Sequence, residues 1–188
     1  MKTLKDCILH NKQSLPKDLC ERLIQEYEPS GLWQRSTSTA QDYRPNDRTS
    51  YGIDISSKEV TAGNYDVRYG LDQEVFHYVG LALQQYRDKF PFVNVSTDTG
   101  FTILRYEKGQ KFVWHVDEGP TLPRRCLSAT FLLNEDFTGG NFLMFDQHKM
   151  KIPLKTGDSI IFPSNFLFTH TVTPVRSGRR YSLIVWFM

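Results

Sequence analysis

The chain has 188 residues, which fits one compact domain, since domains commonly contain about 100–200 residues. Hydrophobic residues make up 39% of the chain and charged residues 23%, which excludes a disordered, collagen-like or simple coiled-coil protein. The 23 Lys and Arg against 21 Asp and Glu give a net charge of +2, too small to indicate a nucleic-acid or membrane partner.

The three cysteines, Cys7, Cys20 and Cys126, are odd in number and widely spaced, so neither a disulfide scaffold nor a cysteine zinc site is expected. The N-terminal residues MKTLKDCILHNKQ lack the apolar run of about 7–15 residues that a signal peptide needs. No run of about 18 apolar residues occurs, so no membrane-spanning helix is expected. We therefore expect a soluble protein of a reducing, cytoplasmic setting.

Two segments of the first half have the apolar spacing of amphipathic helices. The first, PKDLCERLIQEY, begins with a proline, which is favoured at the start of a helix. The second extends from about residue 71 to residue 89. Their apolar positions predict helices that pack against the rest of the fold, through Leu19, Leu23, Ile24 and Tyr27 in the first and Val75, Val79, Leu83 and Tyr86 in the second.

The segment between these helices, residues 31–55, is polar and rich in serine and threonine. Connections longer than about 12–15 residues are uncommon in compact domains and often form binding loops or lids. The sequence leaves both an ordinary surface loop and a lid open.

From Thr99 onward, short β-prone runs alternate with turn signals such as EKGQK, EDFTGG, KTGD and RSGR. The runs are TGFTILRYE, FVWHVD, CLSATFLLN, NFLMF, KIPL, SIIFP, HTVTPV and YSLIVWF. So many short strands within about 90 residues predict a double sheet of jelly-roll type. We expect a mainly β, α+β fold in which the two helices brace one outer face.

Residues 115–117 read His-Val-Asp within the run FVWHVD. Residues two apart on a strand point to the same side, so the His115 imidazole and the Asp117 carboxylate would be presented together. His170 leads into the later run HTVTPV. Two histidines and one carboxylate form the facial triad of non-haem iron(II) oxygenases. Zinc accepts the same ligands, so these residues alone leave the metal open.

Arg180 follows His170 by ten residues and opens the last β-prone run. Its planar guanidinium suits a carboxylate in a bidentate pair. A metal with open positions beside a buried arginine suggests a co-substrate with a chelating end and a distal carboxylate, the shape of 2-oxoglutarate. Ser182, on the same strand face, would add a hydroxyl donor. The alternative is that Arg179 and Arg180 are solvated residues of a basic turn.

The stretch from Gly100 to Phe187 resembles the catalytic core of the iron(II)/2-oxoglutarate dioxygenases, and within them the prolyl 4-hydroxylase-like family. The matching motifs are LRYEKGQKFVWHVD, LLNEDFTGGNFLMF, LKTGDSIIFPS and HTVTPVRSGRRYSLIVWF, and upstream DRTSYGIDI resembles a segment that precedes that core. The resemblance implies a double-stranded β-helix, or cupin-like jelly roll, in a single domain of residues 1–188. Residues 1–98 would supply helical support and a lid-like loop, and residues 99–188 the catalytic core.

The resemblance makes His115, Asp117 and His170 the iron ligands and Arg180 the partner of the distal carboxylate of 2-oxoglutarate. It also implies further contacts to both ligands of the enzyme. The candidates for contact with the co-substrate are Tyr106, Ser182 and Thr130. The candidates for contact with the substrate are Arg48, Tyr51 and Trp186. For Arg48 and Tyr51 the alternative is that they are ordinary loop residues.

Two positions depart from the family pattern. Leu132 stands where several relatives have a tyrosine, and the contact of that tyrosine would pass to Thr130 or Tyr106. Asn141 follows the Gly139-Gly140 pair where glutamate is commoner. Neither change touches the metal ligands, so both bear only on the details of the pocket.

The implied activity is hydroxylation of a C–H bond, foremost prolyl (4-)hydroxylation of a protein or peptide, with 2-oxoglutarate and O2 converted to succinate and CO2. The expected cofactors are Fe(II), 2-oxoglutarate and O2, with ascorbate as a further candidate, and the expected partner is a protein or peptide that contains proline. Related halogenases have a small residue at the position of Asp117, so hydroxylation is preferred. The 31–55 loop would then close over the substrate.

Two other functions stay open. An oxidative nucleic-acid demethylase on the same core would need a basic groove and usually a second arginine in the terminal strand, and YSLIVWFM has none. A non-catalytic jelly-roll binding module should have lost one of the metal ligands or the arginine, and all four are present.

Overall fold

The computed structural model describes residues 3–37, 46–62, 65–119 and 124–188. Its two long helices are α1 (Lys17–Tyr27) and α3 (Tyr65–Lys89), and shorter helical turns occur at η1 (Leu4–Cys7), η2 (Glu28–Ser30) and α2 (Lys58–Ala62). Residues 38–45 of the 31–55 loop lie outside the described residues, so its role as a lid stays a prediction. In the part of the chain that is described, no helix combines the length and the apolar character needed to cross a membrane.

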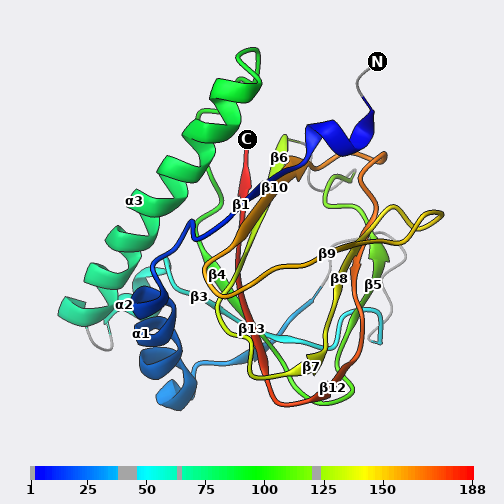
Figure 1. Ribbon diagram of the computed structural model, residues 1–188. Coiled ribbons are helices and arrows are strands. Elements are labelled where there is room, and N and C mark those ends of the chain that lie inside the picture. The colour runs from blue at the N-terminus through cyan, green and yellow to red at the C-terminus, as the bar shows by residue number, and fades with distance from the viewer. Residues whose placement is uncertain (1–2, 38–45, 63–64, 120–123) are drawn as a thin grey trace.

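The strands form two antiparallel sheets that face each other (Figure 1). The larger sheet has the order β1-β10-β6-β13-β4-β3-β2, the smaller one has the order β5-β11-β8-β9, and β12 pairs with β7 as a separate ribbon. Their bounds are β1 (Leu9–Asn11), β2 (Gln34–Arg35), β3 (Tyr51–Asp54), β4 (Thr102–Tyr106), β5 (Phe112–His115), β6 (Leu127–Leu132), β7 (Thr138–Gly139), β8 (Phe142–Met144), β9 (Met150–Ile152), β10 (Ser159–Pro163), β11 (His170–Val172), β12 (Val175–Ser177) and β13 (Arg180–Phe187).

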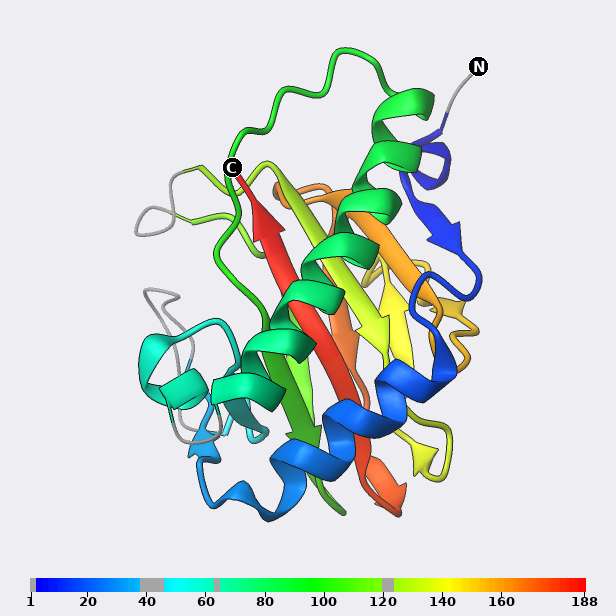
Figure 2. The ribbon, with the colours of Figure 1, turned by 90° about the vertical axis from the view of Figure 1, so that its left-hand side faces the viewer.

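Helices α1 and α3 lie across the outer face of the larger sheet, as the sequence predicts (Figure 2). Helix α1 begins directly after Pro16, and α3 begins at Tyr65, earlier than the expected start near residue 71. Buried apolar side chains of both helices pack into one core with the sheet, among them Leu19, Leu23, Val75 and Val79. A second apolar core fills the space between the two sheets.

Strand β13 shows how the larger sheet separates this core from the space between the sheets. Tyr181, Leu183 and Val185 belong to the core beneath the helices. The residues between them line a pocket that opens between the sheets, namely Arg180, Ser182, Ile184 and Trp186. This division follows from the two-residue period of a strand. One strand therefore contributes both to the core and to the pocket.

The N-terminal half also contributes strands β1, β2 and β3 to the larger sheet, although the sequence predicts no strand there, and β2 and β3 lie within the predicted 31–55 loop. Strand β1 pairs with β10, and β3 pairs with β4, both far away in sequence. The three strands have only 2–4 residues each, too few for a periodic pattern. In the second half, the run HTVTPV is divided into β11 and β12, and Pro174 lies between them, because proline cannot donate a ladder hydrogen bond.

Candidate metal centre and active site

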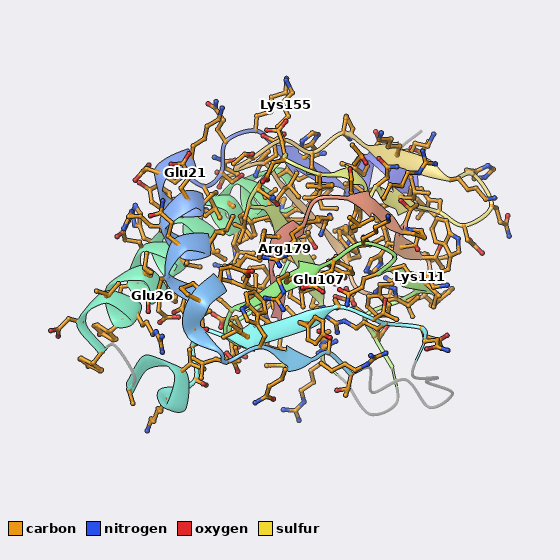
Figure 3. The ribbon with its side chains drawn as sticks, turned by 90° about the horizontal axis from the view of Figure 1, so that it is seen from below. Glu21, Glu26, Glu107, Lys111, Lys155 and Arg179 are labelled. Atoms are coloured by element: carbon orange, nitrogen blue, oxygen red, sulfur yellow. The ribbon has the colours of Figure 1, made fainter. Side chains whose placement is uncertain are left out.

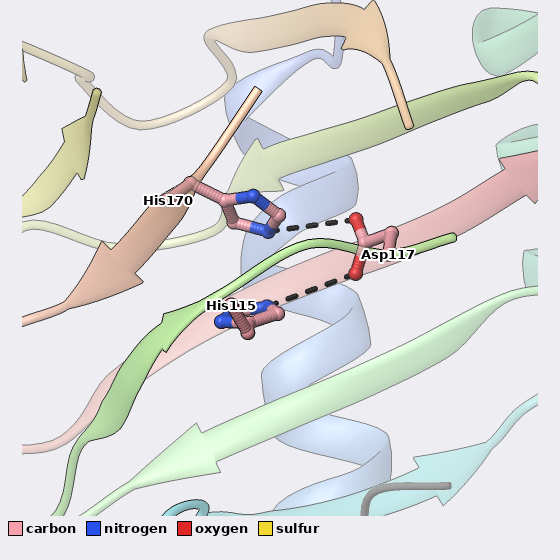
Figure 4. Close-up of side chains that lie close together, drawn as sticks. All are labelled: His115, Asp117 and His170. Atoms are coloured by element: carbon pink, nitrogen blue, oxygen red, sulfur yellow. Dashed lines mark ion pairs between the residues drawn. The ribbon is translucent and has the colours of Figure 1, made fainter. Parts of the chain in front are cut away.

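Three potential metal ligands come together at the adjoining ends of β5 and β11 (Figure 4). His115 ends β5 and His170 begins β11, and the two residues are direct partners in the antiparallel pair. Asp117 lies beyond the end of β5, so the prediction that it belongs to the strand is wrong. The loop nevertheless turns its carboxylate back to the imidazoles, with Nε2–O distances of 3.7 Å for His115 and 3.4 Å for His170. The three ligand atoms lie within 4.8 Å of one another, close enough to hold one ion.

Backbone carbonyl groups orient both imidazole rings. Nδ1 of His115 lies 2.8 Å from the oxygen of Val113, and Nδ1 of His170 lies 3.1 Å from the oxygen of Phe168. A carbonyl oxygen only accepts hydrogen bonds, so Nδ1 carries the proton in each neutral ring. Each Nε2 therefore presents a lone pair toward Asp117, the tautomer that binds a metal.

Asp117 is buried and held by a hydroxyl. Ser128 Oγ donates a hydrogen bond of 2.6 Å to its Oδ2, and Ser164 Oγ lies 2.8 Å from Ser128 Oγ. Burial by itself raises the pKa of Asp117, but the two imidazoles and the hydrogen bond from Ser128 outweigh it and lower the pKa to about 2. The carboxylate is therefore ionised and can serve as a ligand at neutral pH.

His115 is held in its neutral form. Burial, and then the neighbouring His170, lower the pKa of His115 to about 3. Phe112 stacks on the imidazole, with 3.5 Å between ring centroids. The Nε2 atoms of two histidines and one carboxylate oxygen form a donor set that fits Fe(II), with Zn(II) as the other metal of similar ligand preference.

A pocket with about 420 Å³ of empty space connects this centre to Arg180. The three potential ligands and Arg180 all line it, together with apolar side chains that include Leu104, Phe142, Val172 and Ile184. The pocket thus has a potential metal centre, an arginine and an apolar wall, which is the arrangement expected for a ligand with polar ends.

Arg180 is 1% exposed, although it carries a full charge. Its Nη1 donates a hydrogen bond of 2.8 Å to Ser182 Oγ, and its guanidinium carbon lies 5.5 Å from the ring centroid of Tyr106. Its Nε is buried without a hydrogen-bond partner, and within the described residues no carboxylate pairs with it. A buried cation without a counter-charge is costly. The site is therefore suited to an anionic ligand, such as a carboxylate.

Most of the other residues expected at the site also line this pocket, namely Tyr106, Ser182, Thr130, Arg48 and Trp186. The guanidinium of Arg48 lies 4.8 Å from the ring centroid of Phe112. Tyr51 does not line the pocket and instead has its ring 5.2 Å from the guanidinium carbon of Arg105.

Three residues at the centre were not singled out in the sequence. Ser128 holds Asp117, Phe112 stacks on His115, and Arg125 places its guanidinium 3.5 Å from the ring centroid of Trp186. Strand alternation offers a signal for the first, because Ser128 and Thr130 are polar residues in the apolar run CLSATFLLN and share one strand face. No local pattern indicates the contact of Arg125 with Trp186, which joins separate segments. The stacking of Phe112 on His115 is not indicated either, because residues three apart on a regular strand point to opposite faces, and β5 pairs irregularly with β11.

Residues 101–188 match the model of the 2OG-Fe(II) oxygenase superfamily. A PKHD-type hydroxylase of Shewanella baltica is 34% identical over 90 residues, which are 44% of this chain and 39% of that protein. One of Paracoccus denitrificans is 35% identical over 94 residues, covering 44% of this chain and 40% of that protein. These matches confirm that residues 101–188 resemble the 2OG-Fe(II) oxygenase superfamily. They span about two fifths of the length of these relatives.

Solved structures share the fold over nearly the whole chain. A prolyl hydroxylase of Trichoplax adhaerens, in complex with a hypoxia inducible factor peptide fragment, superposes with a TM-score of 0.77 at 15% identity, covering 97% of this chain and 84% of that one. A prolyl-4-hydroxylase of Pseudomonas putida gives a TM-score of 0.68 at 23% identity, covering 96% and 91%. Prolyl hydroxylases have a jelly-roll double-stranded β-helix, so the predicted fold is confirmed.

Proposed function

We propose that this protein is an iron(II)- and 2-oxoglutarate-dependent dioxygenase that hydroxylates a prolyl residue of a protein or peptide. The observation that carries the proposal is the position of Arg180, a buried cation that pairs with no carboxylate among the described residues, in the same pocket as the His115, Asp117 and His170 cluster. A chelating 2-oxo acid with a second carboxylate would satisfy both ends of this pocket.

The roles of the residues follow from their geometry. His115 and His170 would bind iron through Nε2 and Asp117 through a carboxylate oxygen, leaving the other coordination positions open for ligands. When bound, iron(II) and 2-oxoglutarate supply the chemistry that reduces O2, releases succinate and CO2, and converts a substrate C–H bond to C–OH. Arg180 would pair with the distal carboxylate.

Ser182 and the pocket wall would assist the binding of the co-substrate. The Ser182 hydroxyl accepts a hydrogen bond from Arg180 and keeps its own proton available for a carboxylate oxygen. Tyr106 lies beside the guanidinium, opposite Arg180 in the pairing of β13 with β4. The apolar wall excludes water, which strengthens the charge pairing.

A prolyl substrate is supported by the relatives, which are named PKHD-type hydroxylases, and by the prolyl hydroxylases among the structures of the same fold. Arg48 and Trp186 line the pocket and are the described residues that we propose for contact with the substrate. The single-domain organisation, the cytoplasmic location and the use of ascorbate stay predictions from the sequence.

The test is to load the protein with Fe(II), add 2-oxoglutarate and a panel of proline-containing peptides, admit O2, and quantify succinate and the peptide masses. We expect succinate to form and one peptide to gain a single oxygen on proline. A protein that binds the metal but forms no succinate with any peptide would instead be the non-catalytic module. Loss of methyl groups from added nucleic acid, with unchanged peptides, would identify the demethylase.

A further inference from the structure

Arg180 separates the site pocket from a second cavity on its other side. This second cavity, which we call the outer pocket, contains about 870 Å³ of empty space, part of it open to solvent. Arg180 and Phe142 line both pockets, whereas Gly140 and Phe137 line only the outer one. The stem of Arg180 is therefore a wall between two spaces, and its position can change the depth of the site pocket.

Gly140 supports this wall from the outer side. It has a φ of +52°, and a Cβ at this position would lie 2.9 Å from Cδ of Arg180, 3.1 Å from Val175 Cγ2 and 3.2 Å from Phe137 Cε2. Separations below 3.0 Å are not found for real Cβ atoms, so Arg180 occupies the space that a side chain at residue 140 would need. Because Gly140 lines only the outer pocket, a methyl group there would push the arginine toward the metal ligands.

Few polar contacts hold the guanidinium itself. Its described partners are Ser182 Oγ at 2.8 Å and the ring of Tyr106 at 5.5 Å, and Nε is without a partner. The packing of the side-chain stem therefore contributes strongly to where the charge lies.

We propose that Gly140 is a positioning residue that sets the depth of Arg180 and thereby selects the length of the 2-oxo diacid. The inference rests on the proposed function, because it assumes that Arg180 pairs with the distal carboxylate. A diacid with one methylene group more or less would then place its distal carboxylate at a different distance from the guanidinium. A pocket of fixed depth therefore discriminates against diacids that are longer or shorter than the one it fits.

Two variants should change this depth in opposite directions. Gly140→Ala pushes Arg180 inward and should favour oxaloacetate, which is one methylene shorter than 2-oxoglutarate. Phe137→Leu removes the ring edge that flanks Gly140, lets Arg180 withdraw, and should favour 2-oxoadipate, which is one methylene longer. The control is Gly109→Ala, because Gly109 has a φ of +84° with no atom within 4 Å of a built Cβ, so it adds backbone strain without the contact.

The measurement is anaerobic calorimetric titration of each diacid into Mn(II)-loaded protein, with the affinity for Mn(II) determined separately. We expect Gly140→Ala to weaken 2-oxoglutarate binding at least about tenfold. Its affinity for oxaloacetate should fall less or stay unchanged, and its Mn(II) affinity should stay within about twofold of the wild-type value. Gly109→Ala should bind all of these ligands as the wild type does. Phe137→Leu should shift the preference toward 2-oxoadipate, and it tests the proposal independently if Gly140→Ala does not fold.

If the position of Arg180 sets the depth of the site pocket, the two variants must shift the preferred diacid length in opposite directions. Equal losses in Gly140→Ala and Gly109→Ala, or a length preference that Phe137→Leu leaves unchanged, would overturn the role of Gly140 and leave the proposed function standing. Wild-type Mn(II)-loaded protein that binds none of the diacids would instead overturn the proposed function and this inference with it.

Discussion

Ser128 Oγ donates a hydrogen bond of 2.6 Å to Oδ2 of Asp117, and both side chains are buried. Ser128 is already committed as the donor to Asp117, so Ser164, 2.8 Å away, donates to it in turn. Ser128 of β6 and Ser164, which directly follows β10, thus fix the carboxylate of a potential metal ligand that itself lies in a loop. This arrangement compensates for the end of β5 before Asp117.

We expect Ser128→Ala to weaken metal binding, because the carboxylate loses the group that orients it. Loss of such outer contacts typically costs about 10–100-fold in metal affinity. Calorimetric titration of Mn(II) or Fe(II) under anaerobic conditions measures the effect. Ser177→Ala is the control, since Ser177 is exposed and its side-chain hydrogen bond in the described structure is to Thr138, in the β7–β12 ribbon. Similar affinities of the two variants would mean that Ser128 does not position Asp117.

Arg180→Gln should weaken 2-oxoglutarate binding far more than Arg179→Gln. Removing one partner of a buried charge pair costs about 2–5 kcal/mol, which corresponds to a dissociation constant at least about 30-fold higher. Arg179 is the exposed neighbour, and it pairs with Glu28 at 2.5 Å and lies 3.8 Å from Glu107, beside which it is seen in Figure 3. Titration of 2-oxoglutarate into metal-loaded protein checks this, and the reverse ranking would move the anchor to Arg179.

Without ligand, Arg180→Met should raise the thermal stability of the protein. Arg180 is a buried cation without a carboxylate partner in the described structure, and methionine fills similar space without a charge to desolvate. Each kcal/mol gained should raise the melting temperature by about 2–4 °C in a protein of this size. Differential scanning calorimetry of the metal-free proteins measures it, and a lower melting temperature would show that the charge is compensated in the folded state.

Asp72→Asn should stabilise the protein at neutral pH, and the gain should shrink on acidification. Burial, together with the like charge of Asp98, raises the pKa of Asp72 above 3.8, although Ser56 donates a hydrogen bond of 2.7 Å to it. A carboxyl group whose pKa is higher in the folded state costs stability above that pKa, and the cost disappears as the pH falls below it. Denaturation of both proteins between pH 7 and pH 4 tests the sign, with the exposed Glu21→Gln as control; a gain that is independent of pH would contradict it.

The two faces of β13 should respond differently to truncation. Leu183 is fully buried beneath the helices, so Leu183→Ala should lower the free energy of unfolding by about 2–5 kcal/mol. Ile184 lines the site pocket, so Ile184→Ala should chiefly affect 2-oxoglutarate binding. Urea denaturation and ligand titration of both variants separate the effects. If both variants lost the same free energy of unfolding and bound 2-oxoglutarate equally well, one face of β13 would not serve the core and the other the pocket.

Local patterns account for the features that the sequence predicted correctly. The apolar spacing of α1 and α3 and the period of the later strands arise from geometry within one element, so they can be read before the chain folds. The metal cluster was accessible for a related reason, because its residue types are rare in combination and match a known family in order.

The features that were missed depend on pairing over long distances. Strands β1 and β3 are short and exist because β10 and β4 offer free edges. Tyr51 was expected at the substrate, yet its strand directs the ring toward Arg105 and away from the pocket. The contact between Phe112 and His115 joins residues three apart on β5, which would point to opposite faces of a regular strand, and it accompanies the irregular register of β5 with the distant β11.

The sequence by itself determined which groups can do chemistry: two imidazoles, one carboxylate and one guanidinium, carried by β-prone segments in a fixed order. The tertiary structure decided how these groups meet, through the register that sets His170 opposite His115, the loop that returns Asp117 to them, and the missing side chain of Gly140 that makes room for Arg180. The physical reason is that residue type and strand period are local properties, whereas burial, register and close packing exist only after remote segments have come together.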